Sequence, residues 1–147
     1  MAMNLTLRPP RSPRTRLGGF VLLPRIFDKC RAELAGTQGE FHYDCPMDQH
    51  FLNFTGIEAA KLKEEVARGG GDSAILAWIM EHSPRTRSAW EIAQWSTWQE
   101  ARVPSDNETR EFYNEQTAKA GGAAREDIAT WFDYLDLDDF TTFGGQA

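Results

Sequence analysis

The chain has 147 residues, a length typical of one domain, and 41% of them are hydrophobic, which is enough to form a buried core. The formal net charge is −6, yet residues 1–16 contain four arginines and no acid, so the remainder carries 12 basic against 22 acidic residues. Such an acidic body would repel phosphate groups, and we therefore expect no nucleic-acid binding.

The hydrophobic stretches are short. None approaches the ~18 consecutive apolar residues that cross a membrane, and residues 20–23 are too few for the core of a signal peptide. The arginine-rich start also fits a transit peptide, although Pro9, Pro10 and Pro13 would break its amphipathic helix. We predict a soluble cytoplasmic protein without membrane association, in which Cys30 and Cys45 remain free thiols.

Residues 1–19 are predicted to form an extended arm, because prolines fix φ and disfavour helix for the residue before each of them. This arm has two interpretations. Either it packs along the body of its own chain, which we favour, or it is offered as a proline-rich ligand to a partner domain. Gly18 and Gly19 then mark a turn.

The clearest helix covers residues 23–35. Pro24 suits a first helical turn, Ile26, Phe27 and Cys30 fall at helical spacing, and Gly36 provides a stop. Cys30 lies on the apolar stripe of this helix, so we expect a buried and unreactive thiol there.

Residues 39–51 are chemically the densest stretch, with two of the three histidines, one of the two cysteines, three carboxylates and three aromatic rings. The alternation of Phe41, His42 and Tyr43 predicts a short extended segment. Pro46 then starts a helix that Gly56 ends.

Further helices are predicted over residues 57–68, from a cap at Asp72 or Ser73 to residue 82, over residues 88–102 with a Ser88–Glu91 capping box, over residues 105–120 with a Ser105–Glu108 box, and around residues 128–135. Residues 136–147 are predicted to be irregular. The predicted fold is all-α, a single-domain bundle of six to seven helices with an extended N-terminal arm.

Cys45 is the candidate nucleophile. If Pro46 is the first helical residue, Cys45 is the N-cap, where unpaired N–H groups and the helix dipole favour a thiolate, and His42 is the candidate base. Asp48 works against this because its negative charge lies near the same helix end. The alternative, which we favour, is that Cys45 is a small buried residue and that Asp48 caps the helix.

A metal site would draw on the same side chains. His42, Cys45, Asp48 and His50 are good ligand types, but their spacing matches no familiar zinc signature. The acidic residues 136–139 lack the glycine and the closing glutamate of a calcium loop, and no glycine-rich loop follows a predicted strand. We therefore predict no metal and no cofactor.

Three tryptophans, Trp90, Trp95 and Trp98, lie on one predicted helix. At ~100° per residue they spread over an arc of about 140°, which indicates a helix that is buried on most sides or that lines a groove. We favour the buried interpretation.

Several short motifs resemble those of a known family. They are Pro10-Arg11-Ser12-Pro13-Arg14, Leu17-Gly18-Gly19, Leu34-Ala35-Gly36-Thr37, His42-Tyr43-Asp44-Cys45-Pro46-Met47-Asp48-Gln49, and Trp131-Phe132-Asp133. With them the chain resembles an uncharacterised family of small bacterial proteins catalogued as a domain of unknown function. The resemblance implies a single-domain bacterial protein whose arm belongs to the fold. It implies no activity.

Three functional hypotheses follow. The first is a binding module in which the arm, residues 41–50 and the tryptophan-bearing helix enclose a partly polar pocket for a small molecule or a protein segment, with an arginine meeting an anionic group. Its candidate ligand-binding residues are Arg11, Arg14, Arg25, Tyr43, Asp48, His50, Trp95 and Trp98. The second is a cysteine-dependent enzyme, a hydrolase or thiol-transfer catalyst, that uses Cys45 with His42. The third is a purely structural partner-binding protein. The oligomeric state stays open.

Overall fold

The computed structural model describes residues 2–146, and the regular structure of this part of the chain is helical. Its seven helices are α1 (Leu23–Ala35), α2 (Pro46–Thr55), α3 (Ala59–Ala67), α4 (Asp72–His82), α5 (Ala89–Ala101), α6 (Asn107–Lys119) and α7 (Trp131–Thr142). Between residues 2 and 146 there is no strand, and the one β-type pairing is an isolated bridge between Leu17 and Phe20. The prediction of an all-α fold with six to seven helices is confirmed.

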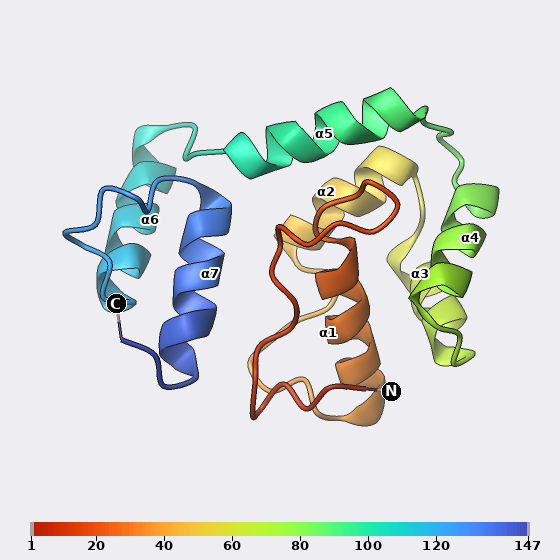
Figure 1. The fold of residues 1–147 in the computed structure, drawn as a ribbon, viewed down its shortest axis with the longest axis horizontal. Helices are drawn as coiled ribbons and strands as arrows, with labels where there is room; N and C mark the ends of the chain where they lie inside the picture. Colours follow the sequence, from red (N-terminus) through yellow and green to blue (C-terminus); the bar gives the residue numbers. More distant parts are fainter. Residues whose placement is uncertain (1, 147) are drawn as a thin grey trace.

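Helix α1 lies at the centre of the molecule (Figure 1). It contacts α3, which in turn contacts α4, while α6 and α7 form a helical pair on the opposite side. Helix α5 crosses above α1 and α2 and joins the two sides, and it also contacts α7. Within residues 2–146, no helix combines the length and the apolar character that crossing a membrane requires.

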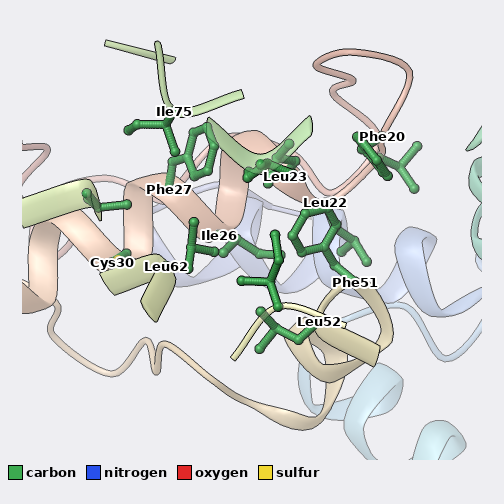
Figure 2. Close-up of a cluster of buried hydrophobic side chains, with 14 of the residues drawn as sticks. Phe20, Leu22, Leu23, Ile26, Phe27, Cys30, Phe51, Leu52, Leu62 and Ile75 are labelled. Atoms are coloured by element: carbon green, nitrogen blue, oxygen red, sulfur yellow. The ribbon is translucent and has the colours of Figure 1, made fainter. Parts of the chain in front are cut away.

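The hydrophobic core surrounds the first half of α1 (Figure 2). Pro24 occupies the first turn of this helix, as predicted, and Gly36 ends it with a left-handed φ of 72°. Every residue from 23 to 30 is buried, including the charged side chains of Arg25, Asp28 and Lys29. Because a buried charge without a partner is costly, the position of α1 requires carboxylates and cations from other elements to meet these three side chains.

Cys30 belongs to this core, as predicted. Its side chain is fully buried among apolar neighbours, and this burial raises the pKa of its thiol to about 12. The Cys30 thiol is therefore neutral and shielded at physiological pH.

The residues ahead of α1 form a series of turns, which does not confirm the predicted extended conformation. One backbone hydrogen bond joins this segment to the residues after α1, and another closes a loop within the segment. The backbone N–H of Leu5, whose side chain is buried, donates to the carbonyl of Thr37 at 2.8 Å. The N–H of Leu22 donates to the carbonyl of Pro13 at 2.9 Å.

Helix α6 differs from its prediction at its start. The capping box is formed by Asp106 and Thr109, one residue after the predicted Ser105 and Glu108 pair. Asp106 is as good a cap as serine, and the Thr109 hydroxyl accepts the Asp106 N–H in place of a glutamate carboxylate. Helix α4 also begins without the predicted side-chain cap, since its N-cap is Gly71.

The predicted irregular tail was wrong for residues 136–142, which continue α7. This helix begins after a capping box between Thr130 and Asp133, and it buries Phe132 and Leu137 against the rest of the fold. Of the acidic residues predicted to lie in an irregular tail, Asp136 and Asp138 are half-buried in this helix and Asp139 is buried.

Candidate functional site

A cavity of about 330 Å³ lies between α1, residues 40–48 and α7. Helix α1 contributes two basic side chains, the loop before α2 contributes most of the wall, and α7 contributes an acid and apolar surface. The lining residues are Arg25, Lys29, Glu40, Phe41, His42, Cys45, Met47, Asp48, Leu135, Asp138 and Thr142.

A buried ion pair forms the floor on the α2 side. The Lys29 ammonium donates to Asp48 Oδ1 at 2.7 Å, and the exposed fractions of the two side chains are only 5% and 1%. The same Nζ lies 3.3 Å from Cys45 Sγ, within hydrogen-bond reach of sulfur. The second Asp48 oxygen accepts the N–H of Asp44 at 3.0 Å, so both oxygens of this buried carboxylate are paired.

The turn before α2 brings Cys45 to this ion pair. Asp44 has a left-handed φ of 63°, a conformation that aspartate tolerates better than most residues, and its N–H bond to Asp48 closes the turn. Tyr43 and Asp44 therefore form a turn, so the predicted extended segment was wrong at these two residues. Cys45 is the N-cap of α2 as predicted, but its side chain caps no N–H group, so Sγ is free to contact Lys29.

A second buried ion pair lies on the α7 side. Arg25 donates to both carboxylate oxygens of Asp139, at 2.7 and 3.3 Å, in the forked geometry that suits a guanidinium. The guanidinium carbon also lies 5.6 Å from the centre of the Phe41 ring, and Phe41 stacks on Phe143 with a separation of 6.3 Å. The two cations of the cavity are thus both neutralised by neighbouring carboxylates.

Two further carboxylates, Glu40 and Asp138, line the cavity without an ion-pair partner among residues 2–146. Burial raises the pKa of Asp138, and the neighbouring Asp139 charge adds to this, while Arg25 acts in the opposite sense. The carboxylates at the cavity that lack an ion-pair partner in this part of the chain are therefore the half-buried Asp138 and the exposed Glu40.

The candidate catalytic pair is only partly assembled. His42 lines the cavity but is exposed, and among the described residues no hydrogen bond joins it to Cys45. Lys29 is the charged side chain that contacts the thiol. Tyr43 points away from the cavity, since its hydroxyl donates to the carbonyl of Ala59 at 2.7 Å and burial raises its pKa.

His50 and Trp95 lie at a different hollow of about 370 Å³, formed with Pro46, Gln49, Asn53 and Phe54. Trp95 stacks on Phe54 at 4.9 Å, and His50 Nδ1 lies 3.3 Å from Gln99 Nε2. Burial, together with the positive charge of Arg102, lowers the pKa of His50. The structure therefore separates these two predicted ligand-binding residues from Cys45.

The prediction that the three tryptophans are core residues was wrong for two of them. Trp95 is half-buried, but Trp90 and Trp98 are 66% and 58% exposed. Helix α5 crosses the molecule as a connecting element, so it buries only the narrow face that carries residues such as Ile92 and Ser96.

Arg11 and Arg14 do not line the cavity. Arg11 pairs with Asp28 of α1 at 3.0 Å and with Asp72 of α4 at 2.8 Å. Arg14 pairs with Asp133 and Asp136 of α7. Both side chains join the N-terminal segment to the helices.

Sequence reasoning did not include Lys29 among the candidate site residues. The i, i+4 spacing of Lys29 and Glu33 is typical of a surface ion pair, but Glu33 pairs with Lys63 at 2.6 Å. The available signal was that Arg25 and Lys29 are four residues apart and share one face of α1. Within residues 2–146, no group of three or more histidine, cysteine or carboxylate side chains is arranged to hold a metal ion.

The model of one protein family, described as "Domain of unknown function (DUF5069)", matches residues 7–141. The match covers most of the chain and confirms the resemblance to a domain of unknown function. No curated protein matches the chain.

Proposed function

The chain belongs to the DUF5069 family, a domain of unknown function, and from its site we propose that it is a binding module for a small organic amine. The binding site is the cavity between α1, residues 40–48 and α7. The observation that carries the proposal is the pair of unpaired carboxylates, Glu40 and Asp138, beside two cations that already have carboxylate partners.

Charge selects the polar end of the ligand. An anionic group would have to compete with Asp48 for Lys29 and with Asp139 for Arg25, and both of these ion pairs are buried. A cationic group meets Glu40 and Asp138 without displacing any contact. This argues against the anionic ligand that the arginines had suggested from the sequence.

Shape selects the rest of the ligand. Phe41, Met47 and Leu135 give the cavity an apolar wall, and a volume of about 330 Å³ lies at the lower end of the range for small-molecule sites. This volume favours a small molecule over a protein segment. The ligand class is therefore an amine that carries a short apolar group.

Thermal unfolding and titration calorimetry with a phenylalkylamine, and with the phenylalkyl carboxylate of matched length, test the proposal. The amine should raise the melting temperature, and Asp138→Asn should weaken its binding about tenfold, the effect of losing one ion pair of ~1.4 kcal/mol. Glu126→Gln is the matched control, because Glu126 is exposed and does not line the cavity. Binding of the carboxylate but not of the amine would overturn the proposal.

The pH dependence gives a second readout. The pKa of Asp138 is raised, so this carboxyl gains its proton at a higher pH than an ordinary aspartate. Amine binding should therefore weaken as the pH falls through the raised pKa, and Asp138→Asn should flatten the part of the profile due to this group.

A second candidate function is a cysteine-dependent enzyme, and the observation that favours it is the Lys29–Cys45 contact of 3.3 Å. In this candidate Lys29, and not His42, assists the thiol. The test is the rate of iodoacetamide alkylation across a pH series. Cys45 should react faster than the buried Cys30. The enzyme hypothesis requires that Lys29→Met lower the alkylation rate of Cys45 and that His42→Ala leave this rate unchanged. If Cys45 is alkylated slowly and Lys29→Met does not change the rate, the hypothesis of a cysteine-dependent enzyme is ruled out.

A further inference from the structure

Lys29 and Cys45 bring an amine and a thiol together at the wall of the cavity. We propose that Cys45 is an oxidative modification site, at which a peroxide converts the thiol to a sulfenic acid and Lys29 then closes it as a sulfur–nitrogen crosslink. This inference does not depend on the identity of the ligand or on amine binding.

The geometry singles out Cys45 among the two cysteines. Cys45 lines a cavity whose volume of about 330 Å³ is large enough to admit hydrogen peroxide, whereas Cys30 is fully buried in the apolar core. Lys29 Nζ is already 3.3 Å from Sγ and is held there by the ion pair with Asp48. The nitrogen therefore reaches the sulfur by a small movement, without unfolding of α1 or α2.

The first step consumes one peroxide. The Cys45 sulfur attacks one peroxide oxygen, the S–O bond forms as the O–O bond breaks, and the thiol proton leaves with the second oxygen as water. Sulfur loses two electrons and the peroxide gains them. The ammonium beside Sγ stabilises the negative charge that sulfur carries as it attacks.

The second step needs no further oxidant. The Lys29 ammonium passes one proton to Asp48, and the free amine attacks the sulfenic sulfur. The S–N bond forms as the S–O bond breaks, and the departing hydroxide takes a second proton from nitrogen and leaves as water. Lys29 keeps one N–H in the sulfenamide product.

Asp48 explains why this chemistry fits a buried site. Before the reaction the floor of the cavity holds one positive and one negative charge, and after it holds a neutral sulfenamide and a neutral carboxylic acid. No unpaired charge is left in a buried position, which would be costly. Two equivalents of an external thiol reverse the step, giving back the Cys45 thiol, the Lys29 amine and one disulfide of the reductant.

The experiment treats the folded full chain with one to two equivalents of hydrogen peroxide and measures its intact mass after denaturation. The crosslinked chain should be lighter by about 2 Da, the mass of the two hydrogens lost. Trypsin should fail to cut after Lys29, and the peptide that starts at Ile26 should be joined to the peptide that contains Cys45. Dithiothreitol should restore both the mass and the cleavage.

Two variants separate this product from its competitors. A Cys30–Cys45 disulfide would give the same mass loss, but Cys30→Ala would abolish it, and that result would overturn the proposal. Cys45→Ser should abolish the crosslink. Lys29→Met should stop the reaction at a sulfenic acid that a 1,3-diketone probe traps. If the wild-type chain is instead trapped by the probe and is cleaved normally after Lys29, the proposal fails, and this measurement needs no variant to fold.

Discussion

Helix α1 makes ion pairs in two places, and they differ in how much water reaches them. The inner pairs, Lys29–Asp48 and Arg25–Asp139, line the cavity, and all four side chains are less than a tenth exposed. Removing four charges from water costs more than ion pairing commonly returns, so such pairs are weak evidence for stability. Both pairs lie at the cavity, and Lys29 also contacts the Cys45 thiol.

The outer network lies where the N-terminal segment meets α1 and α4. Arg11 pairs with Asp28 and Asp72, and Arg31 also pairs with Asp72. Arg11 is 35% exposed and Asp72 is 27% exposed, so water screens part of their charge. These residues join three separate parts of the chain, whereas the inner pairs line a cavity. The comparison teaches that ion pairs of similar geometry differ in burial and in the elements that they connect.

The largest effect is expected from Lys29→Met. It leaves the Asp48 carboxylate buried with only one hydrogen-bond donor, the N–H of Asp44, and breaking a buried pair in this way costs about 3–5 kcal/mol of unfolding free energy. Urea denaturation measures the loss. Adding Asp48→Asn removes the stranded charge and should return most of the stability. If the double variant is no more stable than the single one, the loss does not arise from the charge.

Arg11→Ala should cost less, about 2 kcal/mol, because it removes charged hydrogen bonds to Asp28 while the Arg11 backbone N–H still donates to the same carboxylate at 2.9 Å. Arg8→Ala is the matched control, since Arg8 is exposed in the same segment and has no ion pair in the described chain. Equal losses of unfolding free energy in the two variants would show that the ion pairs of the outer network do not stabilise the fold.

The sequence predicted the parts of the fold that local chemistry decides. Proline at the first turn and glycine after the last one set both ends of α1 and α2. The capping box at Ser88 set the start of α5. At the start of α6, Ser105 and Asp106 are both good caps, and the sequence does not choose between them. The prediction for residues 136–142 was wrong, because a helix there depends on burial of its apolar side chains against other elements of the fold.

The candidate site residues were brought together only in part. Arg25, His42, Cys45 and Asp48 all line the cavity, whereas Arg11, Arg14, His50 and Trp95 do not. Lys29 was missed, because its partners lie 16 and 19 residues further along and a lysine on a helix is usually solvated. Only the packing of α1 in the centre of the molecule buries it.

Asp72→Asn should have a smaller effect that depends on pH. Burial by itself raises the pKa of Asp72, but the hydrogen bonds from Arg11 and Arg31 outweigh it and hold the pKa below the ordinary value of 3.8. A depressed pKa in the folded state adds stability above the unfolded pKa, and this is lost as the pH falls through the folded pKa. The variant should be less stable than the wild type by about 1 kcal/mol at pH 7, and the difference should shrink below pH ~4. A difference that is constant with pH would contradict this origin.

The smallest effect is expected from Arg14→Ala, which removes the pairs with Asp133 and Asp136 of α7. Arg14 is 41% exposed, and exposed pairs contribute about 0.5 kcal/mol. Asp133 does not become unpaired, because one of its oxygens still accepts the N–H groups of Ala129 and Thr130 in the cap of α7. The loss should fall further at 1 M salt, where the Debye length is about 3 Å. If Arg14→Ala lowers the unfolding free energy as much as Arg11→Ala does, and salt does not change this loss, exposure does not determine how much an ion pair contributes. The inner and outer ion pairs would then differ only in their position in the fold.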